Sequence, residues 1–191
     1  MAKIHPRKPM FIDNSCQYLS SKREIFTVWM KSLVINSNGC TVFSSEGKVV
    51  FRVDNYQTRR SRQVQLMNSC GEVLFSLKRK TLQVFRSWDG HKLINSKFNK
   101  DGEWFKVKRK CKLFGRGIVN CHVVLGCNKI KSSSYNIVGF EGKSTFKVTQ
   151  KQSLGGVSFG DDVLTLMVEA HIDQSLIMAL VIVYGMINDK M

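Results

Sequence analysis

Lysines alternate with other residues in one short segment, residues 104–114, WFKVKRKCKLF. Successive side chains of a β-strand point to opposite faces, so a strand here would place its alternating lysines on one face over about 20 Å. These lysines are Lys106, Lys108, Lys110 and Lys112. A row of ammonium groups attracts phosphate groups, and each Lys or Arg near an anionic leaflet contributes about 1 kcal/mol. The alternative is a solvated outer face whose like charges discourage edge-to-edge strand pairing.

Two further basic segments could join this row: LKRK at 77–80 and TRRSR at 58–62. If the segments converge in space, they form a surface that attracts anions by charge and performs no chemistry. The sequence therefore predicts an anion- or lipid-binding surface. Its candidate residues are Lys78, Arg79, Lys80, Lys106, Lys108 and Lys110.

The charge of the whole chain supports an anionic partner. The 191 residues carry 30 Lys and Arg against 14 Asp and Glu, a formal net charge of +16. The excess lies in residues 1–150, with 28 basic and 9 acidic residues, whereas residues 151–191 contain 2 and 5. Such a field attracts polyanions, either nucleic acid or an anionic membrane surface. The alternative is that the charge serves only solubility and weak, non-specific binding.

A nucleic-acid partner finds less support in the sequence. No helix-turn-helix pattern, zinc finger or basic helix is visible, so the charge predicts only a salt-sensitive association without sequence preference. Stacking on RNA bases would need exposed aromatic residues beside the lysines. Trp88, Trp104 and Phe105 are the candidates, and filling the core is the favoured role for at least two of them.

Residues that could perform catalysis are sparse. The four histidines are scattered, and Cys121 and His122 are the one adjacent Cys–His pair. Neighbouring residues of a strand face opposite ways, which argues against direct pairing of this thiol and imidazole. The sequence therefore predicts a protein that is not an enzyme and has no cofactor.

Two other motifs are also interpreted as structural. VGFEGKST at 138–145 has two residues between its glycines where a phosphate-binding P-loop has four, and a strand-like segment follows it. Asp161 and Asp162 could bind a divalent cation, but a polar turn is favoured. Cys121 and Cys127 are poorly spaced as zinc ligands. No metal site is predicted.

Most of the chain has the pattern of short antiparallel strands. Several segments repeat a turn glycine, a charged residue and a strand, with Gly47, Gly71 and Gly142 aligned and Gly90 in a looser fourth copy. In these copies the buried face takes alternate residues, beginning with Phe51 and Val53 and their equivalents. About ten or more such strands cannot remain flat, so they form a barrel or a sandwich.

The most apolar segment, DQSLIMALVIVYGMI at 173–187, lies near the C-terminus. As a helix it would be about 22 Å long, against a hydrocarbon core of about 30 Å. Its apolar residues point in every direction, which is typical of a helix buried on all sides. Asp173 is the expected N-cap. The alternative is a buried core strand. A closed barrel around an axial helix would bury it completely.

Residues 26–56, the CGEVLFSLKRK hairpin at 70–80 and residues 155–187 resemble the plant LURP-one-related proteins. That family belongs to the tubby C-terminal-like superfamily, together with the phospholipid scramblases. The resemblance implies a mainly β fold, a closed antiparallel barrel of about twelve strands around a C-terminal hydrophobic helix. It divides the chain into an N-terminal arm, 1–24, and a barrel domain, 25–191. No catalytic motif defines the family, and no binding residue can be transferred by position.

Some family members are tied to plant defence, and the superfamily includes phosphoinositide-binding, membrane-tethered transcriptional regulators. The predicted function is thus a non-enzymatic module recruited to anionic phospholipid or phosphoinositide head groups in stress or defence signalling. The alternative is a membrane-tethered or nuclear regulator that contacts DNA or a protein complex through the same basic surface. The N-terminus shows no secretory signal and the six cysteines are expected to be reduced. An intracellular location follows, in the cytoplasm, at the membrane periphery or in the nucleus.

Overall fold

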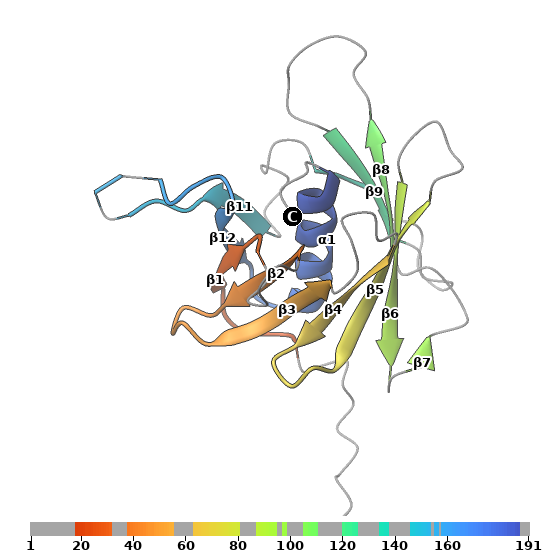
Figure 1. The fold of residues 1–191 in the computed structure, drawn as a ribbon, viewed down its shortest axis with the longest axis horizontal. Helices are drawn as coiled ribbons and strands as arrows, with labels where there is room; N and C mark the ends of the chain where they lie inside the picture. Colours follow the sequence, from red (N-terminus) through yellow and green to blue (C-terminus); the bar gives the residue numbers. More distant parts are fainter. Residues whose placement is uncertain are drawn as a thin grey trace, which may run out of the picture.

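The computed structural model shows a mainly β chain with one helix near the C-terminus (Figure 1). It describes residues 18–31, 38–55, 63–80, 87–94, 97–98, 105–110, 120–125, 134–137, 146–153, 155–156 and 158–187. Residues 1–17 of the predicted arm therefore lie outside the described residues. Tyr18, within the same predicted arm, packs against Phe51 with ring centroids 5.5 Å apart.

The strands follow one another along the chain with short intervals. Their bounds are β1 Glu24–Trp29, β2 Asn38–Phe43, β3 Val49–Asn55, β4 Gln63–Asn68, β5 Val73–Lys80, β6 Ser87–Ile94, β7 Lys97–Phe98, β8 Phe105–Lys110, β9 Asn120–Leu125, β10 Ser134–Ile137, β11 Phe146–Gln150 and β12 Val163–Val168. The helix, α1, spans Gln174–Ile187.

The strands pair antiparallel in the order β10-β9-β8-β6-β5-β4-β3-β2-β1-β12-β11, and β7 pairs with β6. Figure 1 shows α1 surrounded by these strands. The predictions of a mainly β fold, an antiparallel sheet and a C-terminal helix are confirmed. Within the described residues no hydrogen bond joins the two end strands, β10 and β11, so the closed barrel is not shown.

The hairpin turns explain two of the aligned glycines. Gly47 and Gly71 have φ of +77° and +84°, which side-chain-bearing residues rarely adopt. Gly142 lies outside the described residues. The interpretation of Gly90 as a turn glycine was wrong, because Gly90 lies inside β6 between Leu77 of β5 and Phe105 of β8. An added Cβ at Gly90 would clash with the Phe105 ring, so the glycine serves close packing.

Helix α1 begins at the predicted N-cap. Asp173 Oδ1 accepts hydrogen bonds from the backbone N–H groups of Ser175 (2.9 Å) and Leu176 (3.2 Å). Its other carboxylate oxygen receives the Lys92 ammonium at 2.7 Å. These contacts satisfy exposed helix donors and place a negative charge at the positive end of the helix dipole.

The core lies between α1 and the inner face of the sheet. Ten of the fourteen residues of α1 are buried, and Met178, Ile182 and Val183 are fully enclosed. Alternate strand residues face the helix, as predicted for Phe51 and Val53. In the described part of the chain, α1 is too short to cross a membrane.

Candidate functional site

The predicted basic segments meet across three neighbouring strands. Strand β6 lies between β5 and β8. In the register, Asp89 of β6 lies opposite Lys78 on one side and opposite Lys106 on the other. Two basic strands about 30 residues apart in sequence, β5 and β8, are thereby placed on either side of β6. The register thus places the two basic strands around one acidic residue.

These lysines lie on the outer face of the sheet. Lys78 and Lys80 alternate with Leu77 of β5, which is completely buried in the core. Lys106 likewise lies between buried Phe105 and Val107 in β8. Because strand residues alternate between faces, the lysines point away from α1. Lys78 and Lys80 are exposed, and Lys106 is half-buried. We call Lys78, Lys80 and Lys106 the lysine face.

Asp89 lies at the centre of the lysine face and was not foreseen. Its side chain is only 2% exposed, and Lys80 Nζ lies 2.6 Å from its Oδ2. Lys106 Nζ is 3.9 Å from Oδ1. A buried carboxylate is costly unless cations accompany it, so Lys80 and Lys106 have a structural role as well. Lys78 has no salt bridge to a carboxylate within the described residues.

Of the other three predicted residues, one lies on the opposite face and two have side chains outside the described residues. Arg79 is on the opposite face of β5, half-buried beside its register partner Trp88. Lys108 and Lys110 belong to β8, but their side chains lie outside what the structure describes. The basic segment 58–62 also lies outside the described residues. Of the six predicted residues, the lysine face as described contains Lys78, Lys80 and Lys106, and the binding role of all six stays a prediction.

The aromatic residues near the lysines are part of the core. Trp88 is 5% exposed and Phe105 is fully buried, as expected for core filling. Trp104 lies outside the described residues. Neither buried ring is accessible to a stacking base. An aromatic platform for RNA is therefore not formed by these two residues.

The acidic pair at 161–162 is engaged within the protein. Asp162 Oδ2 pairs with Lys31 Nζ at 2.9 Å and accepts a hydrogen bond from Trp29 Nε1 at 3.2 Å. The Lys31 ammonium, together with the Trp29 indole, holds the pKa of Asp162 below its ordinary value. Asp161 accepts a hydrogen bond from the Gln150 amide at 3.0 Å. The favoured interpretation, a polar turn, fits these contacts better than a cation site.

No catalytic or metal-binding cluster is found in the parts of the chain that can be described. Within them, no three His, Cys, Asp or Glu side chains are grouped to hold a metal ion. Cys121 and His122 lie in β9, and their side chains fall outside the described set. Among the described cysteines, Cys40 and Cys70 are free thiols. Burial raises the pKa of the Cys40 thiol to about 12, so this thiol is not a nucleophile.

The amino-acid sequence matches one protein family over most of its length. The family model for LURP-one-related proteins covers residues 24–185. LURP-one-related 11 from Arabidopsis thaliana is 36% identical, with 98% of this chain and 89% of the relative aligned. LURP-one-related 3 from the same plant is 37% identical, with 100% of this chain and 94% of the relative aligned.

The fold also has a counterpart among solved structures. An X-ray structure of an Arabidopsis thaliana protein superposes with a TM-score of 0.52, covering 93% of this chain and 98% of that one. At 15% identity this likeness concerns the fold alone. The sequence match carries the assignment: the chain belongs to the LURP-one-related family.

Proposed function

We propose that this protein is a non-enzymatic binding module, recruited to anionic phospholipid head groups through the lysine face, in stress or defence signalling. The observation that carries the proposal is the register of β5, β6 and β8. It gathers Lys78, Lys80 and Lys106 around the single carboxylate of Asp89 on the outer surface. Lys108 and Lys110 enter the proposal by their positions in β8, two and four residues after Lys106.

Charge supports weak, salt-sensitive attachment. The lysine face has three ammonium groups and one carboxylate, so it retains a net positive charge. At about 1 kcal/mol for each basic residue near an anionic leaflet, the surplus provides only a few kcal/mol. Screening weakens such an interaction as the ionic strength rises. We therefore expect binding that depends on acidic lipid and decreases with salt.

The same proposal includes a closed barrel in the domain 25–191. The supporting observations are that strands lie on both sides of α1 (Figure 1) and that ten of its fourteen residues are buried. A closed barrel leaves no unpaired strand edges, and it would present the outer face of every strand to solvent or to a membrane.

Vesicle flotation tests the proposal. The full chain is mixed with neutral phosphatidylcholine vesicles or with vesicles that also contain phosphatidylserine or a phosphoinositide. We expect flotation only with the acidic vesicles. Lys78→Glu is expected to reduce the floated fraction several-fold, because Lys78 is exposed and lies opposite Asp89.

Lys22→Glu is the matched control, since Lys22 precedes β1 and its side chain is 79% exposed. Both variants change the net charge equally, so a difference in flotation between them would report a specific binding surface. Equal flotation of the two variants, or equal binding to neutral vesicles, would remove the proposal. Retention of duplex DNA at low salt that is sensitive to Lys78→Glu, without binding to acidic vesicles, would favour the regulator of transcription instead.

A further inference from the structure

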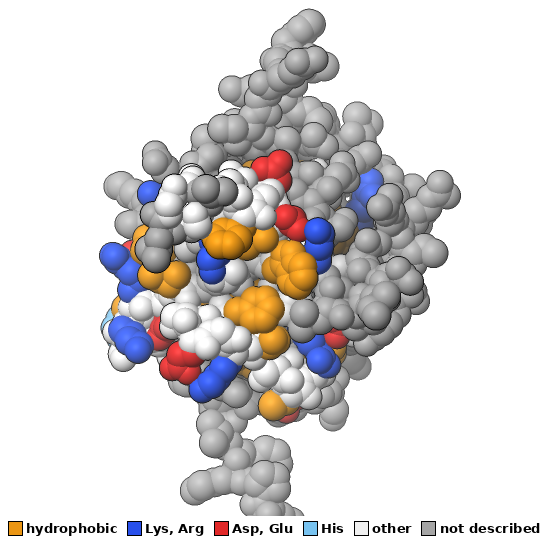
Figure 2. All heavy atoms as spheres, turned by 60° about the vertical axis from the view of Figure 1, so that its left-hand side comes forward, with side chains coloured by type: hydrophobic (Ala, Val, Ile, Leu, Met, Phe, Trp, Pro, Cys, Tyr) orange, Lys and Arg blue, Asp and Glu red, His pale blue; other side chains and the backbone are white. Residues whose placement is uncertain are grey.

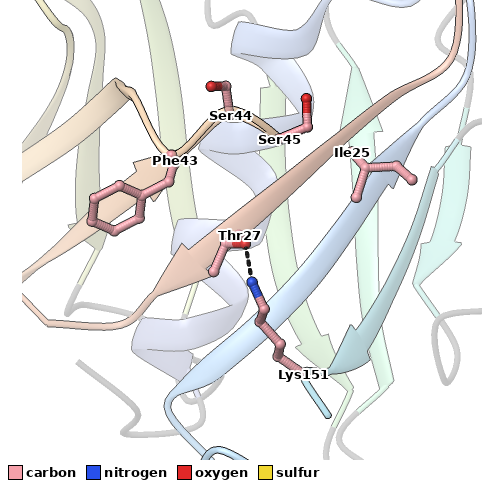
Figure 3. A pocket seen from close by; sticks show the side chains of 7 residues that line it. Ile25, Thr27, Phe43, Ser44, Ser45 and Lys151 are labelled. Atoms are coloured by element: carbon pink, nitrogen blue, oxygen red, sulfur yellow. Dashed lines mark hydrogen bonds between the residues drawn. The ribbon is translucent and has the colours of Figure 1, made fainter. Parts of the chain in front are cut away.

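A pocket of about 350 Å³ opens on the outer surface beside β1 (Figure 3). It is bounded by β1, by the end of β2 with the following turn, and by the residue after β11. The lining residues are Ile25, Thr27, Phe43, Ser44, Ser45, Gly47 and Lys151. Its size lies within the range of small-molecule sites.

Lys151 is held firmly in this pocket. Its backbone N–H donates to Val163 O at 2.9 Å, and its carbonyl accepts from Phe159 N at 3.1 Å. The side chain extends to β1, where Nζ donates to Thr27 Oγ1 at 2.6 Å (Figure 3). In the described residues no carboxylate forms a salt bridge with this half-buried ammonium. Lys151 therefore contributes a cation that no carboxylate of the described residues neutralises.

The polar groups around Lys151 are available as donors. The Thr27 hydroxyl accepts from Lys151, which leaves its proton to donate. Ser44 Oγ already accepts the N–H groups of Glu46 (3.2 Å) and Lys48 (3.3 Å), so its proton is likewise directed elsewhere. Ser45 also lines the pocket, but Figure 3 shows its hydroxyl pointing away from Lys151. An ammonium together with hydroxyl donors is complementary to an oxyanion.

The remaining walls are apolar. Ile25 is 49% exposed although it lies in a strand, and Phe43 is half-buried on the opposite side. Ile25 lies opposite Met167 of β12 in the register, which extends the apolar surface. Figure 2 shows this side of the molecule, where hydrophobic side chains gather with lysines or arginines around them. A ligand seated here would meet donors and hydrocarbon together.

We infer that this pocket binds a small amphipathic oxyanion, with its phosphate or carboxylate head at Lys151 and its apolar body against Ile25 and Phe43. The inference is independent of the lysine face, since the two sites share no residue. The head would accept hydrogen bonds from the Lys151 ammonium and the Thr27 hydroxyl. The hydrocarbon part would cover Ile25, which is unusually exposed for its type.

Amide chemical-shift titration of the full chain tests the inference with four soluble probes: hexyl phosphate, hexanoate, inorganic phosphate and hexanol. We expect saturable shifts at Thr27, Ser44 and Ser45 with hexyl phosphate or hexanoate, and weaker binding of inorganic phosphate. Hexanol lacks the charge and is expected to leave these signals in place. Hexanol binding as tight as that of hexyl phosphate, or inorganic phosphate binding equally tightly, would overturn the inference.

Lys151→Gln removes the charge but keeps a hydrogen-bond donor. Its affinity for the better anion is expected to decrease about tenfold or more, the effect of losing a charged hydrogen bond. Lys147→Gln is the matched control, because Lys147 is an exposed lysine of β11 on the same face but does not line the pocket. Similar affinities of the two variants would contradict the inference.

Ile25→Asp is a second test variant of the pocket, and it leaves Lys151 in place. Ile25 is half-exposed, so the change leaves the core intact, and the new carboxylate would compete for the ammonium. Anion binding is expected to be lost while Lys78→Glu leaves it unchanged. Undiminished anion binding by Ile25→Asp would also overturn the inference.

Discussion

At the scale of single residues, buried or half-buried carboxylates form salt bridges with several of the described lysines. Asp89 holds Lys80 and Lys106, Asp173 holds Lys92, and Asp162 holds Lys31. Each of these salt bridges joins two different segments of the chain. Lys78 and Lys151 differ, because no described carboxylate forms a salt bridge with either of them. Among the described lysines, these two therefore offer charge to a partner at the two sites discussed above.

The lowered pKa of Asp162 predicts a dependence of stability on pH. Because the folded pKa lies below the ordinary value of about 3.9, ionised Asp162 stabilises the fold above that pH. This contribution is lost as the pH falls through the folded pKa. Thermal unfolding between pH 6 and pH 2.5 is the measurement. Asp162→Asn is expected to lower Tm at pH 6, with the difference from the parent chain decreasing below about pH 4.

Lys31→Met tests whether the Lys31 ammonium causes the lowered pKa of Asp162. The variant removes the ammonium that lowers the pKa of Asp162 most. Adding Asp162→Asn to the Lys31→Met chain should therefore lower Tm less than Asp162→Asn lowers it in the parent chain. Lys22→Gln, another exposed lysine, serves as the control and should leave the dependence unchanged. A difference between Asp162→Asn and the parent chain that stays constant from pH 6 to pH 2.5 would contradict this account.

At the scale of elements, alternation along a strand was readable from the sequence, but register was not. The lysines of β8 alternate with Phe105 and Val107, so their sharing of a face follows from the period of two. The position of Asp89 between Lys78 and Lys106 depends on hydrogen bonds across three strands. The same limit explains Gly90, whose local sequence resembles a turn although it packs against Phe105.

A substitution at Gly90 tests the packing of β6 against β8. Gly90→Ala introduces a methyl group into the fully buried Phe105 ring, so overpacking should lower the free energy of unfolding by about 1–3 kcal/mol. Urea denaturation measures the loss. Gly155→Ala is the matched control, because its added Cβ would be 3.8 Å from the Ser153 hydroxyl and meets no clash. Equal stability of both variants would show that β6 and β8 are not packed this closely.

Helix α1 was the most predictable element. Its run of apolar residues is longer than most strands, and in a helix these side chains point in every direction. Asp173 precedes the run as the N-cap. The pocket at Lys151 was beyond sequence reasoning, because its residues come from segments more than 100 positions apart. Neither Thr27 nor Ser45 belongs to a motif that would single it out. Only the pairing of β1 with β2 and β12 brings them to one side.

At the scale of the whole molecule, the hydrophobic helix and the lysine face lie on opposite sides of the sheet, the helix in the core and the lysines on the outer face. The sheet encloses α1, so the most apolar part of the chain stabilises the fold. The proposed attachment to a membrane would therefore depend on the charge of the lysine face. The match to the LURP-one-related family model, residues 24–185, includes every strand and most of α1.

Hydrogen exchange of the α1 amides, with and without acidic vesicles, tests this central claim most directly. If α1 is the core, residues 177–187 exchange only through global unfolding, with protection equal to that of the buried strand β3, and vesicles slow α1 and β3 by the same factor. Binding at the lysine face would slow exchange further at the lysine-bearing residues of β5 and β8. Rapid exchange of α1 in the free chain, or a change confined to α1 on addition of vesicles, would contradict the account.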